Sequence, residues 1–196
     1  MRLLGTIKRV QIQRDPLKEG VAPNRVYSTD PLMVVDALKI TPRGIFGQMM
    51  DGGEIIDVHH LDHPRSRNRE NENGISFNFT SHYDQIINKF GKHISVGDAG
   101  ENILIEATRT IEESDLGVRI AIKNARTDEL LYLDGVRFAV PCVEFSYYLL
   151  DERAKGEIIK DTLQFVDQGT RGFYATYTGK QLDPIIHVGD KVYAID

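Results

Sequence analysis

Hydrophobic and polar residues alternate along many short segments of the chain. The alternation is clearest in residues 75–80 and 118–123, and a strand with one buried face has this period of two. Similar runs occur at residues 5–13, 33–40, 103–105, 135–140, 173–177 and 192–195. Turn-forming pairs and triplets bound many of them: Asp51-Gly52-Gly53, Asp134-Gly135, Thr178-Gly179 and Gly189-Asp190. Numerous short strands separated by such turns predict a mainly β fold, a sandwich or a barrel, with a few helices.

Three segments depart from this alternation. Residues 82–90 carry a one-sided apolar stripe with the period of a helix, with Ser81 as a candidate N-cap and Gly91 as the stop. The stripe consists of Tyr83, Ile86, Ile87 and Phe90. Residues 143–150 fit either a helix or a strand, and residues 158–166 fit a helix. The aligned apolar residues of the last segment are Ile159, Leu163 and Val166.

Residues 59–74 form the most polar stretch of the chain and predict a long surface loop. The neighbourhood of this loop resembles a metal cluster at first sight, with Asp57, His59, His60, Asp62 and His63. Neither strand nor helix geometry brings the adjacent His59 and His60 to one face, so we interpret the segment as solvated. Three arginines of the loop could contact an anion: Arg65, Arg67 and Arg69.

Length and composition narrow the function classes. The chain has 196 residues, 41% hydrophobic and 27% charged, without a repeat or a composition shift, which predicts one globular domain over residues 1–196. A formal charge of −5 argues against nucleic acid as the main partner. No apolar run is long enough to cross a membrane, and Lys8 and Arg9 interrupt the N-terminal apolar run before a secretion signal could form. With a lone cysteine, Cys142, we expect a cytoplasmic protein without disulfides or multi-thiolate metal sites.

Cys142 follows a predicted strand and Pro141, and it precedes the segment 143–150. If that segment is helical, the helix dipole and free backbone N–H groups favour the thiolate, which is a nucleophile and a ligand for soft metals. The alternative is a small buried hydrophobic residue, which is how most lone cysteines behave.

Two glycine-containing motifs could meet a ligand. Residues 97–103 contain Gly100, Glu101 and Asn102 before an apolar strand, so a tight turn could bring backbone close to a ligand; the alternative is a simple turn between strands. In residues 168–174, Arg171 lies between glycines and could bind a phosphate or carboxylate in a bidentate manner; the alternative is a solvated arginine in a turn.

In this order, the motifs resemble the successive signatures of the MOSC domain family. These domains occur at the C-terminus of molybdenum cofactor sulfurases and also as stand-alone bacterial proteins. The matching stretches are Gly100-Glu101-Asn102-Ile103, Val140-Pro141-Cys142, Thr170-Arg171-Gly172-Phe173-Tyr174-Ala175 and Val188-Gly189-Asp190-Lys191-Val192. The strongest of them lie within residues 95–196. One signature departs from the family, because residues 44–50 lack the Asp and His of a Gly-Leu-x-Gly-Asp-x-His segment. Other residues, such as those of the loop from His59 to Asp62, would have to replace them.

The resemblance implies a barrel-like fold with Cys142 in a cleft. It also implies molybdenum cofactor (molybdopterin) as the cofactor, with Cys142 as the molybdenum ligand or as a sulfur carrier in persulfide form. Such a protein would be a reductase of N-hydroxylated small molecules or a sulfur transferase, with an electron-transfer protein or a cysteine desulfurase as partner. Arg171 would bind the anionic group of the cofactor, and Gly100, Glu101 and Asn102 would shape or bind at the cleft with fixed amide donors. The pyridoxal phosphate of fused sulfurases belongs to a separate domain that 196 residues cannot contain.

Two alternatives stay open. The missing Asp and His favour a non-catalytic pterin- or anion-binding module with the same fold. A hydrolase or transferase with a Cys142 nucleophile would need a histidine base, for which the candidates are His82, His93 and His187.

Overall fold

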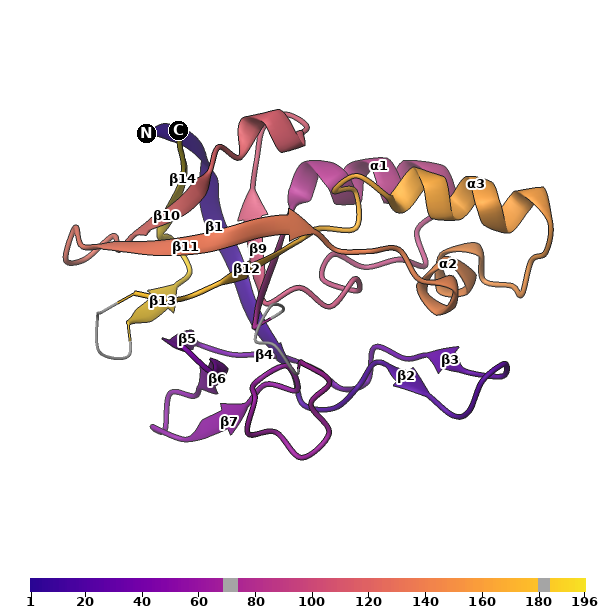
Figure 1. Cartoon of the computed structure of the whole chain (residues 1–196), viewed down its shortest axis with the longest axis horizontal. Coiled ribbons are helices and arrows are strands. Elements are labelled where there is room, and N and C mark those ends of the chain that lie inside the picture. The colour runs from indigo at the N-terminus through magenta and orange to yellow at the C-terminus, as the bar shows by residue number, and fades with distance from the viewer. Residues whose placement is uncertain (69–73, 180–183) are drawn as a thin grey trace.

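The computed structural model describes residues 1–68, 74–179 and 184–196. Its largest unit is a closed barrel made of β1 (Arg2–Gln13), β8 (Ile75–Phe79), β9 (Ile103–Glu106), β10 (Arg119–Lys123), β11 (Leu130–Phe138), β12 (Phe173–Thr176) and β14 (Lys191–Ile195). These strands are hydrogen-bonded in the order β14-β10-β11-β12-β8-β9-β1, and pairing of β1 with β14 closes the ring (Figure 1). The prediction of a mainly β, barrel-like fold is confirmed.

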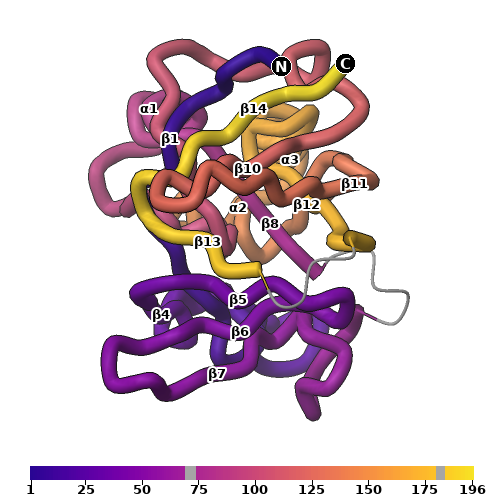
Figure 2. Tube along the Cα trace, turned by 90° about the vertical axis from the view of Figure 1, so that its left-hand side faces the viewer, coloured from indigo at the N-terminus to yellow at the C-terminus, as the bar shows by residue number. Residues whose placement is uncertain are grey.

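A second, four-stranded sheet lies against one side of the barrel (Figure 2). It contains β5 (Ala37–Thr41), β6 (Gly44–Gln48), β7 (Glu54–Ile56) and β13 (Ile185–His187). Strand β4 (Leu32–Val34) pairs with the end of β1, and β2 (Lys18–Glu19) and β3 (Val26–Tyr27) form a small hairpin that extends below the helices in Figure 1. The predicted loop 59–74 falls partly outside the described residues, because these exclude 69–73 and with them Arg69.

Three α-helices gather on one side of the barrel: α1 (Thr80–Phe90), α2 (Val143–Leu150) and α3 (Glu157–Val166) (Figure 1). A 3-10 turn, η1, covers Glu113–Asp115. Segment 143–150, which the sequence left open, is therefore a helix. No described helix combines the length and the apolar character that spanning a lipid bilayer requires. Helix α1 connects β8 to β9, the one parallel pair in the ring, since a parallel connection needs a crossover.

Three local expectations were wrong. Helix α1 begins before Ser81, because β8 runs directly into it and the extended Phe79 occupies the N-cap position. Residues 33–40 are two strands, because the chain leaves β1 and enters the second sheet near Val35. Asp134-Gly135 lies inside β11, where the register opposite β12 shifts and the positive φ of Gly135 (61°) permits a bulge.

The buried apolar side chains form two clusters. The larger fills the barrel and the space under the second sheet, with Phe77 and Phe173 stacked 5.3 Å apart. The smaller lies between the helices and the β2–β3 hairpin, where Tyr27 packs on Phe145. Burial of this second cluster holds the helical layer and the hairpin together, and the site described next lies beside it.

Candidate functional site

A cavity of about 580 Å³ lies on the outer side of the barrel wall. Ser76, Tyr174 and Arg137 stand in register across β8, β12 and β11, and all three line it. They alternate with the core residues Phe77 and Phe173, so strand geometry turns their side chains away from the barrel interior, and the two phenylalanines also border the cavity. The turn before β9, the β2–β3 hairpin and residues of the segment that follows β7 complete the wall.

Cys142 occupies the predicted junction. Strand β11 ends at Phe138, and Cys142 is the N-cap residue of α2, with its carbonyl oxygen accepting the N–H of Ser146 at 3.1 Å. The thiol is partly exposed and packs on the cluster that contains Tyr27 and Phe145. It is not among the described residues that line the cavity, although its near neighbour Val140 is.

Arg171 lines the cavity and lies close to Cys142. Its guanidinium donates to the carbonyl oxygen of Val140 and lies 5.3 Å from the centre of the Phe145 ring. Burial lowers the pKa of Arg171, but the negative charge that Cys142 and nearby tyrosines can carry outweighs burial, so the pKa is raised overall. Its Nε atom is buried without a hydrogen-bond partner among the described residues. The structure thus brings together Cys142 and Arg171, which are 29 positions apart.

Glu101 is the acidic side chain of the cavity. It is 4% exposed, and its Oε2 atom accepts the hydroxyl of Tyr83 at 2.7 Å. The same hydroxyl accepts the backbone N–H of Ala99 at 2.9 Å, so Tyr83 is fixed between helix and turn. Burial raises the pKa of Glu101 to about 7, against the opposing hydrogen bond from Tyr83. The other oxygen, Oε1, has no hydrogen-bond partner in the part of the chain that the structure describes.

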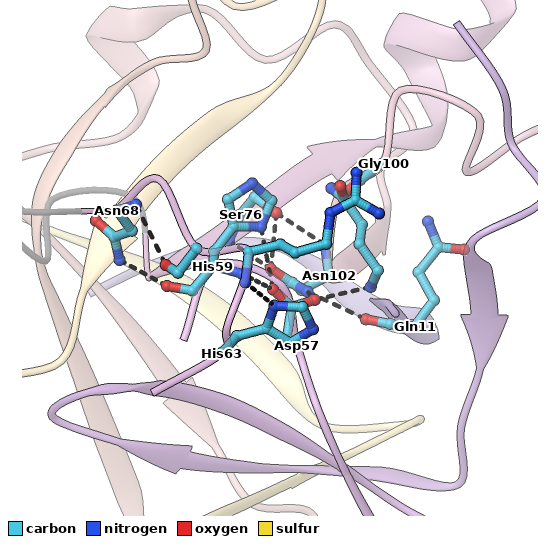
Figure 3. Close-up of polar contacts among 11 residues, drawn as sticks. Gln11, Asp57, His59, His63, Asn68, Ser76, Gly100 and Asn102 are labelled. Atoms are coloured by element: carbon cyan, nitrogen blue, oxygen red, sulfur yellow. Dashed lines mark hydrogen bonds and ion pairs between the residues drawn. The ribbon is translucent and has the colours of Figure 1, made fainter. Parts of the chain in front are cut away.

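Asn102 is buried behind the cavity wall and has no free polar atom. Its Oδ1 accepts the N–H and the hydroxyl of Ser76, and its Nδ2 donates to Gln11 and to Asp57, at 2.9 Å in the last case (Figure 3). These four bonds use the full capacity of an amide side chain. Asn102 therefore shapes the wall by joining the turn before β9 to β8, to β1 and to the turn after β7.

Gly100 lines the cavity at a place where a side chain does not fit. Its φ is +86°, and a Cβ atom would lie 2.6 Å from Leu17 and 2.8 Å from Gln13. The backbone N–H groups of Gly100 and Asn102 are bonded to the carbonyl oxygens of Gly97 and Ser76. The expectation that this turn offers amide donors to a ligand is wrong for these two groups, because they hold the turn itself together.

Asp57 and His59 form a hydrogen-bonded pair at the edge of the cavity. Asp57 is fully buried, and its Oδ1 atom lies 3.0 Å from Nδ1 of His59, which lines the cavity (Figure 3). Burial raises the pKa of Asp57, but hydrogen bonds from His59 and from the backbone N–H of Gln13 outweigh burial and hold the pKa below its usual range. A buried carboxylate that orients a histidine is an arrangement suited to holding or moving a proton.

The interpretation of this segment as solvated is wrong in part. Besides Asp57, His60 is also buried, with Nδ1 accepting the N–H of Asp62 and its ring packed on Phe46. Burial lowers the pKa of His60. Among the described residues no group of three side chains is arranged to hold a metal ion.

The cavity is rich in positive charge although the chain is acidic. The basic side chains that line it are Lys18, His59, Arg65, Arg67, Arg137 and Arg171, whereas Glu101 is the one acid among the lining residues that the structure describes. Arg65 is paired with Asp15 at 2.5 Å. Opposite charges therefore meet in one cavity, with the cations in excess.

The three histidines considered as a base for Cys142 do not line this cavity. Both ring nitrogens of His82 are engaged, by Asn78 at 2.9 Å and by the carbonyl oxygen of Ile111 at 2.8 Å. His93 is bonded to the carbonyl oxygen of Leu149, and His187 lines a different cavity beside β13. His59 belongs to the loop that the sequence offered as a replacement for the missing Asp and His, but its pairing with Asp57 was not predicted. The spacing Asp57-Val58-His59, equal to that of the missing Asp-x-His, is the signal that could have found it.

Comparisons with known proteins support the fold. No family model matches the chain, and no curated protein matches its sequence. Among solved structures, YuaD from Bacillus subtilis matches with a TM-score of 0.57 and 14% identity over 98% of this chain and 96% of that one. YiiM from Escherichia coli matches with a TM-score of 0.51 and 15% identity over 84% of this chain and 65% of that one. YiiM from Geobacillus stearothermophilus matches with a TM-score of 0.51 and 12% identity over 100% of this chain and 75% of that one.

YuaD and YiiM are MOSC-domain-type proteins, so the likeness agrees with the resemblance seen in the sequence. At these identities it concerns the fold alone. The match to YiiM from Escherichia coli spans slightly less than two thirds of that protein's length. The chain therefore has a MOSC-like fold, and its chemistry has to be argued from its own residues.

Proposed function

We propose that the protein binds a molybdenum-pterin cofactor in the cavity, with the thiolate of Cys142 as the sulfur ligand of the metal. The observation that carries the proposal is the presence of two buried polar atoms without partners among the described residues, Nε of Arg171 and Oε1 of Glu101, on residues that line one cavity. Buried polar groups are nearly always hydrogen-bonded, so a donor and an acceptor left without partners in a cavity point to a polar ligand.

The donor set fits this cofactor. A phosphate at one end of the ligand would meet the excess of cationic side chains, to which Arg67 and Lys18 belong. A thiolate is a soft ligand that suits molybdenum, and Cys142 is partly exposed beside Arg171 at the N-terminus of α2. When bound, the molybdenum would supply the electrons for reduction of an N-hydroxylated compound.

The protein's own residues would hold the ligand and a proton. Arg171 would keep an anionic group beside Cys142, and the Asp57–His59 pair would hold a proton at the cavity edge. In this proposal the pair would take the place of the Asp and His that the family signature lacks here. A substrate would be a small molecule, since the cavity volume is about 580 Å³.

A second candidate is sulfur transfer with a persulfide on Cys142. The observation in its favour is the apolar, exposed surface next to the thiol, where Val140 is 73% and Val143 40% exposed. A sulfur-donating protein such as a cysteine desulfurase could contact this surface and reach the partly exposed thiol.

The test is to express the protein in a host that makes the cofactor and to measure molybdenum and pterin in the purified chain. We expect both in the wild type, loss of molybdenum in Cys142→Ala, and loss of pterin in Arg67→Ala. Arg126→Ala, an exposed arginine on the β10–β11 turn outside this cavity, is the matched control and should keep both. Absence of molybdenum and pterin from the wild type, together with no persulfide on Cys142 after treatment with a cysteine desulfurase, would refute both candidates.

A further inference from the structure

A second cavity, of about 640 Å³, lies between the β10–β11 turn and strand β13. Figure 1 and Figure 2 both show β13 next to the hairpin of β10 and β11. Among the described residues, none lines both this cavity and the one that Arg171 lines. The second cavity is therefore a separate site, and a ligand bound there is independent of the proposed function.

The buried carboxylate of Asp190 joins two walls of the second cavity. Asp190 is 1% exposed, and its Oδ1 atom accepts the N–H of Ala125 in the β10–β11 turn at 2.9 Å. Its Oδ2 atom accepts the N–H of His187 in β13 at 2.8 Å. The backbone of Gly189 and Asp190 also forms two hydrogen bonds with Ile7 of β1. The walls are therefore held at a fixed separation, and the cavity is formed before any ligand binds.

The β10–β11 turn carries polar side chains to the edge of this cavity and is itself held by hydrogen bonds. The Oδ1 atom of Asn124 accepts the N–H groups of Arg126 and Thr127, at 2.8 and 3.1 Å. The N–H of Asn124 donates to the carbonyl oxygen of Glu129 at 2.9 Å. An Asx turn of this kind fixes the local backbone. Arg126, Thr127 and Glu129 therefore line the cavity from defined positions.

The floor of the second cavity is apolar. Ile122 of β10 and Leu131 of β11 are cross-strand partners, and Ile186 of β13 lines the same cavity. All three side chains are buried and belong to the larger apolar cluster. A ligand with an apolar body matches such a floor, because contact removes apolar surface from water.

The charged group that lacks a partner in the second cavity is a cation. Both lining acids are engaged, Asp190 by two N–H groups and Glu129 by the hydroxyl of Thr127 at 3.3 Å. The guanidinium of Arg126 is exposed and has no hydrogen bond or ion pair with any residue that the structure describes. The Nδ1 atom of His187 is buried and has no partner in the same part of the chain. A carboxylate can accept hydrogen bonds from both groups, since a neutral imidazole can carry its hydrogen on Nδ1.

We propose that the second cavity binds a small carboxylate with an apolar body, of the size of octanoate. The carboxylate is bound by Arg126 and by Nδ1 of His187, and the apolar body lies on the floor formed by Ile122, Leu131 and Ile186. An ammonium compound of the same shape lacks these hydrogen bonds and is repelled by Arg126. A carboxylate without an apolar body does not cover the floor and therefore binds more weakly.

The probes are octanoate, octylammonium and acetate. Octylammonium shares the apolar chain of octanoate and has the opposite charge, whereas acetate shares the carboxylate and lacks the long chain. Each probe is titrated into the full chain while NMR follows the methyl signals of isoleucine and leucine. We expect octanoate to cause saturable shifts at Ile122, Leu131 and Ile186, and to bind at least about tenfold more tightly than either of the other probes.

Variants of the two proposed donors sharpen the measurement. Arg126→Gln and His187→Leu should each lower the affinity for octanoate by about threefold to tenfold, the effect of one hydrogen bond. His187→Asn can place an amide N–H near the position of Nδ1 and should keep most of the affinity. The matched control is Arg14→Gln, which replaces an exposed arginine that lines neither cavity and should leave the affinity unchanged. The comparison of probes on the wild type needs no variant and stays decisive if a variant fails to fold.

Equal affinities for octanoate and octylammonium, the absence of saturable shifts, or shifts confined to residues of the cavity that Arg171 lines would overturn the proposal. An octanoate affinity that both Arg126→Gln and His187→Leu leave unchanged would do the same. The molybdenum and pterin content of the purified chain reports on the other cavity, so failure of one proposal can be told apart from failure of the other.

Discussion

Replacing Glu101 by glutamine keeps the size of the side chain and removes its titration. Burial raises the pKa of Glu101 from an ordinary value of 4.5 to about 7 in the folded protein. The group is an acid with a raised pKa, so the folded state binds its proton more strongly than the unfolded state does. The contribution of Glu101 to stability is therefore fully present below pH 4.5 and is lost as the pH rises through about 7.

The magnitude follows from the size of the shift. One pKa unit corresponds to about 1.4 kcal/mol, so ionisation of Glu101 in the buried cavity costs the folded state about 3 kcal/mol at pH values above 7. Glutamine does not ionise and avoids this cost. The free energy of unfolding of the Glu101→Gln variant should exceed that of the wild type by less than about 1 kcal/mol near pH 5 and by about 3 kcal/mol near pH 8.

Urea unfolding of the wild type and of Glu101→Gln, followed by circular dichroism between about pH 5 and pH 8, measures the difference. Glu152→Gln removes a carboxyl group at an exposed position after α2 and is the matched control. Its free energy of unfolding should run parallel to that of the wild type. The reasoning is refuted if the curves of the wild type and Glu101→Gln are parallel as well. A variant that gains stability and no longer retains pterin during purification would indicate that Glu101 is kept for binding.

The cavity wall gives two further predictions for the free energy of unfolding. Asn102→Ala should lower the free energy of unfolding by about 2 to 4 kcal/mol, because several buried groups lose their hydrogen-bond partners. The control Asn88→Ala, on the exposed face of α1, should change it by less than about 0.5 kcal/mol. Similar losses in the two variants would contradict the role given to Asn102. Gly100→Ala should cost about 2 kcal/mol more than Gly52→Ala, since both have a positive φ but only Gly100 is crowded. Equal losses in thermal or urea unfolding would show that backbone strain alone matters.

Much of the local structure could be predicted from residue types and their spacing. Alternation identified most barrel strands, since a strand with one buried face needs an apolar residue at every second position. The stripe from Tyr83 to Phe90 identified α1 for the analogous reason. The boundaries that failed depend on neighbours in space. Gly135 is part of a bulge because β12 pairs with β11 beside it. Residues 33–40 form two strands because the first part pairs with β1 and the second part pairs with β6.

The candidate site likewise has features that the sequence indicated and features that depend on residues distant along the chain. Gly100, Glu101 and Arg171, which belong to the sequence motifs, line one cavity, and Cys142 is the N-cap of α2 close to Arg171. The sequence did not predict that Asn102 would use all its bonds on the protein. Those bonds depend on Asp57 and Ser76, which lie 45 and 26 positions away along the chain.

The sequence by itself determined the class of fold, the strand that precedes Cys142 and the identity of the charged groups available for a site. These properties depend on patterns within a few residues, where backbone periodicity and capping act. Closure of the barrel decided the rest, because it sets β8 between β9 and β12 and carries the turn after β7 against Asn102. Only that arrangement places the Asp57–His59 pair at the cavity edge, buries Glu101 enough to raise its pKa, and leaves one of its oxygens without a partner among the described residues.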